Sequence, residues 1–154
     1  MALPDDPAAF VAAAEKATND YDVDAAHSVY SADARLENYV DGSFEVWEGG
    51  DAVRSAWDAY LGAMRDRSFS LRKTLLTADG DTIVNTWTGS LGGRTDAQGI
   101  EYWRFDGEGK VREHRLYSLM NVKPTNHPLA RLRLAAAYPV SALAFLRSRK
   151  RVGI

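Results

Sequence analysis

The chain has 154 residues, of which 45% are hydrophobic and 26% are charged, and these values are typical of one globular domain that buries its own core. Its formal net charge of -2 gives no overall attraction to nucleic acid. Because the sequence has no cysteine, it excludes disulfides, thiol nucleophiles and zinc-thiolate sites.

Charge is distributed unevenly along the chain. Residues 1–127 contain all 21 acidic side chains and 13 basic ones, whereas residues 128–154 contain six basic side chains and no acidic one. The opening MALPDDPAAF lacks the basic region and the long apolar stretch of a signal peptide. No run reaches the roughly 18 apolar residues of a membrane span. We therefore expect a cytoplasmic protein.

Two helices are predicted near the start of the chain. Residues 4–7 (PDDP) form a helix-start signal, and the Ala-rich segment after them keeps helical spacing to about Thr18. A second, short helix is predicted to begin near Asp22. It spaces Val23, Ala26, Val29 and Tyr30 along one side.

A strand and the clearest helix of the chain follow. Residues 34–40 (ARLENYV) are a strand candidate, residues 41–43 (DGS) a turn and residues 44–48 (FEVWE) a short extended piece. The Gly-Gly-Asp segment at residues 49–51 then leads into a helix with one broad apolar stripe. The stripe consists of Val53, Ala56, Trp57, Tyr60, Leu61 and Met64.

From residue 68 onward the hydrophobic period falls to two, which is typical of strands. Four strand candidates, joined by Asp- and Gly-rich turns, lie within residues 68–78, 81–91, 99–105 and 110–120. Sequential hairpins form a meander. The sequence therefore predicts an α+β domain over residues 1–124, in which the helices cover one curved face of an antiparallel sheet.

The last part of the chain, residues 125–154, is predicted to be an extra C-terminal helix interrupted at Pro139. It is amphipathic and basic, and we expect it to pack on its own domain. A dimer contact and an anionic membrane surface are the alternatives. Six positive charges without an aromatic platform do not indicate a nucleic-acid site.

One acidic residue on the last hairpin calls for an explanation. In GIEYWRFDGEGKVREH, residues 99–114, alternation places Glu101, Trp103 and Phe105 on one face of the strand. The two aromatic residues are typical of a core, so Glu101 is expected to point into the same apolar interior. A carboxyl group there needs a partner, a change of protonation or a catalytic role.

The order of the elements resembles the SnoaL-like and ketosteroid isomerase-like proteins of the nuclear transport factor two superfamily, over about residues 8–122. YDVDAAHSVYSADARLENYV is similar to the family's second helix and first strand, WEGGDAVRSAW to its glycine-led third helix, and GIEYWRFDGEGKVREHRLY to its last hairpin. The resemblance implies a cystatin-like fold, in which a curled sheet wraps the helices around a deep conical pocket.

The resemblance also implies roles for individual residues. The position of Glu101 matches an inward acid that, in ketosteroid isomerase-like members, stays protonated and donates a hydrogen bond to a substrate oxygen. The family's general base matches Asn38, and its substrate-binding tyrosine falls near Ala14, neither of which takes up a proton. The aspartate that related cyclases and epoxide hydrolases carry on the final strand has no counterpart. Steroid isomerisation by the family's route is therefore not expected.

His114 is the second candidate, because many SnoaL-like members have a histidine at this position. Antiparallel pairing can bring Glu101 and His114 into one polar patch, and a carboxyl and an imidazole form an acid-base pair near neutral pH. Plainer interpretations remain for each candidate: a salt-bridged or rim carboxylate at Glu101, a packed histidine at His114, and an amide at Asn38 that satisfies backbone groups.

The sequence favours a cofactor-independent acid-base enzyme of the isomerase, cyclase, hydratase or epoxide-hydrolase type, acting on a small apolar molecule such as a polyketide, terpenoid or steroid. A non-catalytic ligand-binding or assembly module is the alternative. The resemblance implies a homodimer through the outer face of the sheet, where Tyr102 and Arg104 project. The catalytic candidates are Glu101, His114 and Asn38, the ligand-binding candidates are Trp57, Tyr60, Trp87, Trp103, Phe105, Leu116 and Ser118, and no metal site is predicted.

Overall fold

The computed structural model describes residues 3–120 and, after them, residues 132, 135–136, 139–140 and 143, without the side chains of residues 94–96. The chain divides into two units, Met1–Val122 and Lys123–Ile154. The six described residues of the second unit are helical. The rest of the predicted C-terminal helix, and its packing, lie outside the described residues.

Three helices form in the first unit: α1 (Pro7–Asn19), α2 (Val23–His27) and α3 (Gly50–Asp66). Asp6 caps the N-terminus of α1: its side chain accepts hydrogen bonds from the first-turn backbone N–H groups, and Pro7 directly follows as the first helical residue. α2 is shorter than predicted, because Tyr30 begins a strand and does not continue the helix. α3 buries the predicted stripe through Val53, Ala56, Trp57 and Leu61.

Six strands form one sheet: β1 (Tyr30–Val40), β2 (Ser43–Glu48), β3 (Ser70–Asp79), β4 (Thr82–Leu91), β5 (Arg94–Phe105) and β6 (Val111–Leu119). Their order is β2-β1-β6-β5-β4-β3. The meander from β3 to β6 is antiparallel, as predicted. β1 and β6 are parallel, because α3 carries the chain from one edge of the sheet to the other and the meander returns to the centre beside β1. The sheet is therefore mixed and not wholly antiparallel.

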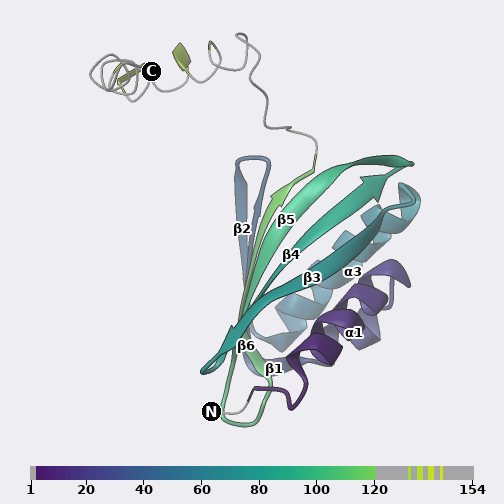
Figure 1. The fold of residues 1–154 in the computed structure, drawn as a ribbon, viewed down its shortest axis with the longest axis vertical. Helices are drawn as coiled ribbons and strands as arrows, with labels where there is room; N and C mark the ends of the chain where they lie inside the picture. The colour runs from purple at the N-terminus through teal and green to yellow at the C-terminus, as the bar shows by residue number, and fades with distance from the viewer. Residues whose placement is uncertain (1–2, 121–131, 133–134, 137–138, 141–142, 144–154) are drawn as a thin grey trace. The chain divides into compact units, whose positions relative to one another are not determined.

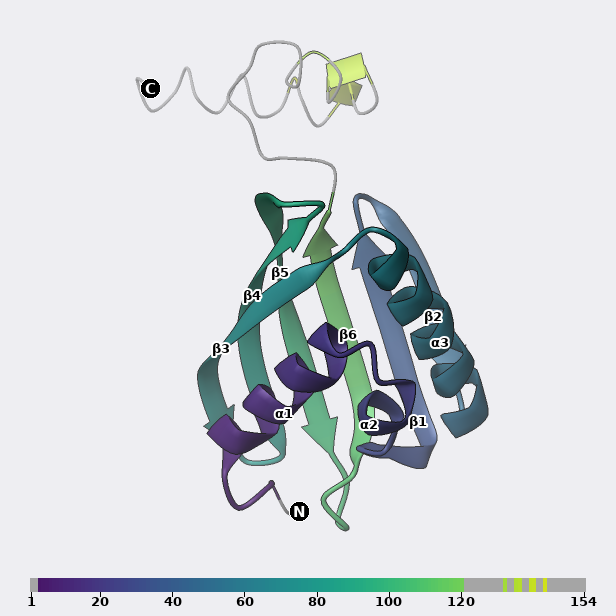
Figure 2. The ribbon, with the colours of Figure 1, turned by 90° about the vertical axis from the view of Figure 1, so that its right-hand side faces the viewer.

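All three helices cover the same face of the curved sheet (Figures 1 and 2). The main core lies between them and the sheet, and it includes Leu36, Leu61, Ile83 and Val111. On β5, Glu101, Trp103 and Phe105 are buried, whereas Ile100 is 46% exposed, so the predicted alternation is confirmed. Within the described part of the chain, no helix is both long and apolar enough to span a membrane.

Candidate functional site

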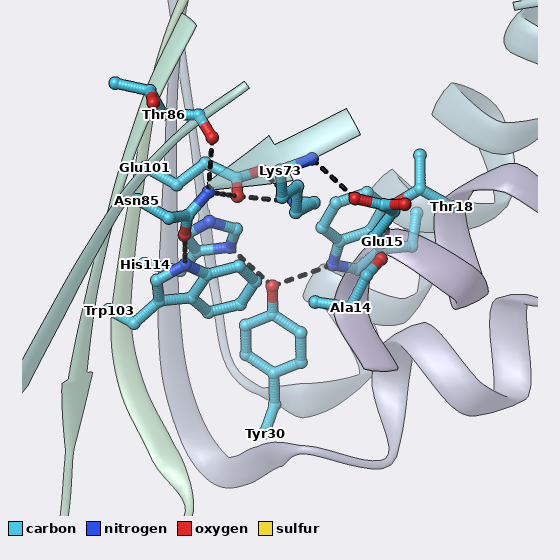
Figure 3. Close-up of polar contacts among 11 residues, drawn as sticks. Ala14, Glu15, Thr18, Tyr30, Lys73, Asn85, Thr86, Glu101, Trp103 and His114 are labelled. Atoms are coloured by element: carbon cyan, nitrogen blue, oxygen red, sulfur yellow. Dashed lines mark hydrogen bonds and ion pairs between the residues drawn. The ribbon is translucent and has the colours of Figure 1, made fainter. Parts of the chain in front are cut away.

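The side chain of Glu101 is held in the interior by an ion pair, which confirms the salt-bridged interpretation of this residue, although the sequence did not identify Lys73 as the partner. Lys73 on β3 donates from Nζ to both carboxylate oxygens, and the Nζ–Oε1 distance is 2.5 Å. The exposed fractions of the two side chains are 1% for Lys73 and 2% for Glu101. Asn85 on β4 adds a hydrogen bond of 2.8 Å from Nδ2 to Oε2. Three neighbouring strands therefore position one carboxyl group (Figure 3).

This arrangement differs from the role that the family resemblance implies for Glu101. A donor role requires a protonated carboxyl group, whereas here Glu101 accepts hydrogen bonds from an ammonium group and an amide. A carboxylate has about four lone-pair positions, so Oε1, which accepts one of these bonds, can still receive a proton. The geometry thus favours a proton acceptor at Glu101.

The network continues from the ion pair into the rest of the core. Asn85 Oδ1 accepts a hydrogen bond of 2.7 Å from Trp103 Nε1, so the amide orients both the carboxylate and the indole. The backbone N–H of Lys73 donates to Glu15 Oε2 on α1 at 2.6 Å. Helix and sheet are thus joined directly beside the ion pair (Figure 3).

His114 is enclosed by aromatic side chains. Its ring stacks on Trp103 with centroids 3.5 Å apart, and Trp57 lies almost parallel at 6.1 Å. Nδ1 is 2.6 Å from the hydroxyl of Tyr30, which also accepts a hydrogen bond of 3.0 Å from Trp57 Nε1. His114 is completely buried, and Nε2 has no hydrogen-bond partner among the described residues.

The protonation states of this cluster follow from its burial. Burial, and then the positive charge of Lys73, hold the pKa of His114 well below its usual value. Burial raises the pKa of Tyr30 well above its usual value. Both groups are therefore neutral at pH 7, and we assign the hydrogen bond as Tyr30 O–H donating to Nδ1. The cluster holds its rings in place and supplies no proton.

A cavity of about 260 Å³ lies between α3, the end of α1 and the sheet, and its walls are mostly apolar. Glu101 lines this cavity, together with Arg67 and the polar side chains of Thr18, Asn38, Tyr60 and Ser118. Asn38 Nδ2 donates to the Tyr60 hydroxyl at 2.8 Å, and burial raises the pKa of Tyr60 well above its usual value. A buried carboxylate thus borders a mostly apolar hollow whose volume is slightly below that of common small-molecule pockets.

The structure brings most of the predicted site residues to this cavity. Those that line it are Asn38, Trp57, Tyr60, Trp87, Glu101, Leu116 and Ser118. His114, Trp103 and Phe105 are not among its lining residues. Trp103 instead lines a neighbouring cavity, and Phe105 packs edge-on against Phe10 at 5.1 Å. Glu101 and His114 therefore do not converge on one point of this cavity.

Two residues of the network, Lys73 and Asn85, are not among the site residues predicted from the sequence. The signal that identified Glu101 was also present for them, because strand alternation places Lys73 on the face of Leu71 and Leu75. It likewise places Asn85 between Ile83 and Trp87. A polar residue at an inward strand position therefore indicates a member of the buried network on each of the three strands β3, β4 and β5.

Among the described residues, no group of three or more His, Asp or Glu side chains is arranged to hold a metal ion.

Comparisons with known proteins agree with this architecture. No curated protein matches the chain. A cystatin-fold protein of unknown function from Methylobium petroleophilum is 17% identical, with a TM-score of 0.61 over 84% of this chain and 85% of that one.

Two further solved structures have the same fold. A SnoaL-like protein of unknown function from Burkholderia thailandensis is 19% identical, with a TM-score of 0.58 over 73% of this chain and 93% of that one. The epoxide hydrolase/cyclase-like enzyme SalBIII, described for pyran ring formation in the polyether salinomycin, is 21% identical. Its TM-score is 0.56 over 73% of this chain and 89% of that one. At these identities the likeness shows the fold alone.

The family itself is shown by sequence. The SnoaL-like domain profile matches residues 10–114, which is more than half of the chain. The match begins in α1 and ends on β6, and so includes the elements that carry Lys73, Asn85 and Glu101. The chain belongs to the SnoaL-like domain family.

Proposed function

We propose that the protein is a cofactor-independent acid-base enzyme that binds a small, largely apolar organic molecule in the 260 Å³ cavity. One observation carries the proposal: Glu101, only 2% exposed, lines a mostly apolar cavity of about 260 Å³. A positioned Glu side chain is a common general base, and a site that excludes water strengthens the electrostatic interactions inside it. The enzyme SalBIII on the same fold supports this class of chemistry.

The residues have distinct proposed roles. Glu101 takes a proton from the bound molecule, while Lys73 and Asn85 hold its oxygens in position. Asn38, tied to Tyr60, orients a polar group of the ligand by hydrogen bonding. Trp57 and Trp87 exclude water from the cavity. His114 has no proton-transfer role, since its ring is enclosed by aromatic side chains away from the cavity lining.

A non-catalytic ligand-binding module is the second candidate, and one observation favours it. The hydrogen bonds from Lys73 and Asn85 satisfy Glu101 without any ligand, as expected for a purely structural carboxylate. In that case the cavity binds a ligand but leaves it unchanged.

The experiment that separates the two candidates begins with a ligand screen. Polyketides, terpenoids, steroids and epoxides are tested for thermal stabilisation, because a molecule that binds the folded state raises its apparent stability. Each stabilising compound is then incubated with the protein and examined for isomerised, cyclised, hydrated or ring-opened product. Conversion that is lost in Glu101→Gln supports the enzyme, while stabilisation without conversion of any compound supports the binding module.

The assembly state is part of the same proposal. The outer face of the sheet has an apolar groove beside exposed Phe44, Ile100 and Tyr117. Tyr39 stacks on Phe44 at 4.5 Å and on Tyr117 at 4.7 Å, so the groove is preformed. The expected partner is a second copy of the chain.

The charges beside this groove suit pairing with a second copy. A row of ion pairs with alternating sign crosses the outer face next to the groove, through Glu37, Arg104, Glu113 and Arg115. When two copies of the chain pair across a two-fold axis, the two rows run in opposite directions, so that acidic residues of one copy can face basic residues of the other. Arg104 belongs to this charged row. The guanidinium of Arg115 lies over the ring of Tyr102, with its Cζ atom 5.8 Å from the ring centroid.

The cytoplasmic location expected from the sequence stays a prediction.

A further inference from the structure

A chain of hydrogen bonds runs from an exposed carboxylate on β2 to a buried amide on the wall of the 260 Å³ cavity. The Tyr60 hydroxyl donates to Glu45 Oε2 at 3.3 Å and accepts from Asn38 Nδ2 at 2.8 Å. Glu45 is exposed, Tyr60 is half-buried on α3, and Asn38 on β1 is only 8% exposed. A charged group outside the cavity is therefore linked to a polar group inside it.

The carboxylate sets the direction of both hydrogen bonds. A carboxylate only accepts hydrogen bonds, and a phenol has one proton to donate. Because Tyr60 donates that proton to Glu45, its oxygen accepts from Asn38, and Nδ2 of the amide therefore points toward Tyr60. Burial is the main cause of the raised pKa of Tyr60, and the charge of Glu45 raises this pKa further. The hydroxyl thus keeps the proton that it donates.

The carbonyl end of the same amide is left without a partner. Among the described residues, Asn38 Oδ1 has no hydrogen bond, yet it is not sealed within the packing as His114 Nε2 is. The space beside Asn38 on the inner face of the sheet is the cavity, which it lines together with its strand partner Leu116. Oδ1 is therefore an unused acceptor at the cavity wall.

The other polar side chains of the lining do not set this preference. The Thr18 hydroxyl donates to the carbonyl oxygen of Ala14 at 2.9 Å. The Ser118 hydroxyl can donate or accept, so it serves either kind of ligand. Asn38 differs from them, because its hydrogen-bond direction is fixed from outside the cavity.

An isolated asparagine does not have this selectivity. Its terminal torsion is broad and roughly two-fold, and a half-turn exchanges the donor and the acceptor with little change of shape. The contact with Tyr60 makes one of the two orientations the favoured one, and Glu45 decides which one it is.

We propose that Glu45, acting through Tyr60, orients the Asn38 amide so that its carbonyl oxygen selects a ligand with a hydroxyl donor, an alcohol or a phenol. This inference rests on the proposed function and narrows its ligand class. Glu45 and Tyr60 are then positioning residues. A ketone of the same skeleton binds less tightly, because its oxygen only accepts and leaves Oδ1 unpaired.

The binding test uses three probes with one ring skeleton: 2-tetralol, 2-tetralone and the hydrocarbon tetralin. By isothermal titration, we expect the wild type to bind the alcohol about tenfold more tightly than the ketone. Tyr60→Phe breaks the chain, and Glu45→Lys replaces the acceptor by a donor, so in both variants this ratio should fall to about one or below. Asp58→Lys makes the same change of charge at an exposed position of α3 and should keep the wild-type ratio.

The ratio separates a change of orientation from damage to the cavity. A variant that only disturbs the packing weakens the binding of all three probes, tetralin included, and leaves the ratio of alcohol to ketone unchanged. A wild type that binds neither oxygen-bearing probe, or that does not prefer the alcohol, overturns the inference. So does an alcohol preference that survives in Tyr60→Phe or in Glu45→Lys.

The orientation of the amide can also be measured without a ligand. In the wild type, the side-chain NH₂ protons of Asn38 lie toward the Tyr60 ring, so we expect nuclear Overhauser contacts between them and the ring protons beside the hydroxyl. These contacts should weaken in Glu45→Lys and persist in Asp58→Lys. Contacts of equal strength in Glu45→Lys and in the wild type contradict the role of Glu45.

A failure of this inference is distinguishable from a failure of the proposed function. Equal binding of the alcohol and the ketone removes the roles of Glu45 and Asn38 in selecting the ligand. The wider ligand panel, with conversion and its loss in Glu101→Gln, still decides whether the protein is an acid-base enzyme.

Discussion

Lys73 on β3 and Glu101 on β5 form an ion pair across the intervening strand β4, with both side chains almost completely buried. Taking two charges out of water is costly, and a close partner repays that cost only while both members are present. This relationship links the stability of the fold to the proposed chemistry, because the same carboxylate borders the larger cavity.

The first prediction concerns the stability of this pair. Lys73→Met leaves a buried carboxylate without its ammonium partner, and we expect it to lower the free energy of unfolding by about 3–5 kcal/mol. Lys73→Met/Glu101→Gln should recover most of this loss, since neither charge remains. Urea denaturation of the four members of this double-mutant cycle measures the coupling. Additive effects of the two substitutions would show that the pair does not interact.

The second prediction concerns pH. Because the pKa of His114 lies well below its usual value in the folded state, the unfolded chain, with a histidine pKa of about 6.5, binds the proton more readily. The stability that the neutral ring contributes is present above about pH 6.5 and is lost as the pH falls toward the folded-state pKa, by up to about 1.4 kcal/mol per pH unit.

Denaturation curves at pH 5, 6, 7 and 8 measure this effect. His114→Gln should remove this part of the pH dependence, whereas His27→Gln, at a half-buried histidine on α2, should keep it. The same slope in His114→Gln and in the wild type would show that another group is responsible.

The third prediction concerns a close approach in the sheet. A Cβ atom on Gly99 would lie 2.5 Å from the carbonyl oxygen of Tyr117 and 2.6 Å from the indole of Trp87. Gly99→Ala therefore displaces either backbone or a cavity-lining ring, and we expect a loss of about 1–3 kcal/mol in thermal or urea unfolding. Gly107→Ala is the control, because nothing lies within 4 Å of its added Cβ. Equal stability of the two variants would contradict the packing at Gly99.

The fourth prediction concerns the proposed dimer. Ile100→Glu places a charge in the apolar groove on the outer face, and we expect sedimentation velocity to show a dimeric wild type and a monomeric variant. Leu76→Glu, at an exposed position of β3 outside the groove, should leave the dimer intact. A monomeric wild type, or a dimer that Ile100→Glu leaves unchanged, would rule out this interface.

The sequence predicted the fold well where local patterns carry the information. Period-two alternation placed Glu101, Trp103 and Phe105 inward, and helical spacing identified the buried stripe of α3. The parallel pairing of β1 with β6 was not predictable in this way, because it depends on where the meander returns across the sheet. Tyr30 was placed in a helix because its spacing from Val23 and Ala26 fits a helix, although the chain turns into β1 there.

The site was predicted less completely, because its geometry depends on packing across distant segments. Lys73 reaches Glu101 from 28 residues away in sequence, and no local pattern pairs them. In the β5–β6 register, Trp103 is the partner of His114 and Leu116 that of Glu101. His114 therefore lies beneath the Trp103 ring. Strand alternation predicts only that His114 points inward, and it does not tell whether the side chain lines the cavity.

The most direct test of the central claim is the turnover of Glu101→Gln with the ligand that the wild type converts fastest. A glutamine keeps the shape of the side chain but cannot take up the proton. We predict that the single-turnover rate falls by at least about 100-fold, while the dissociation constant changes by less than about threefold. A Glu101→Gln protein that binds and converts the ligand at the wild-type rate would contradict the account.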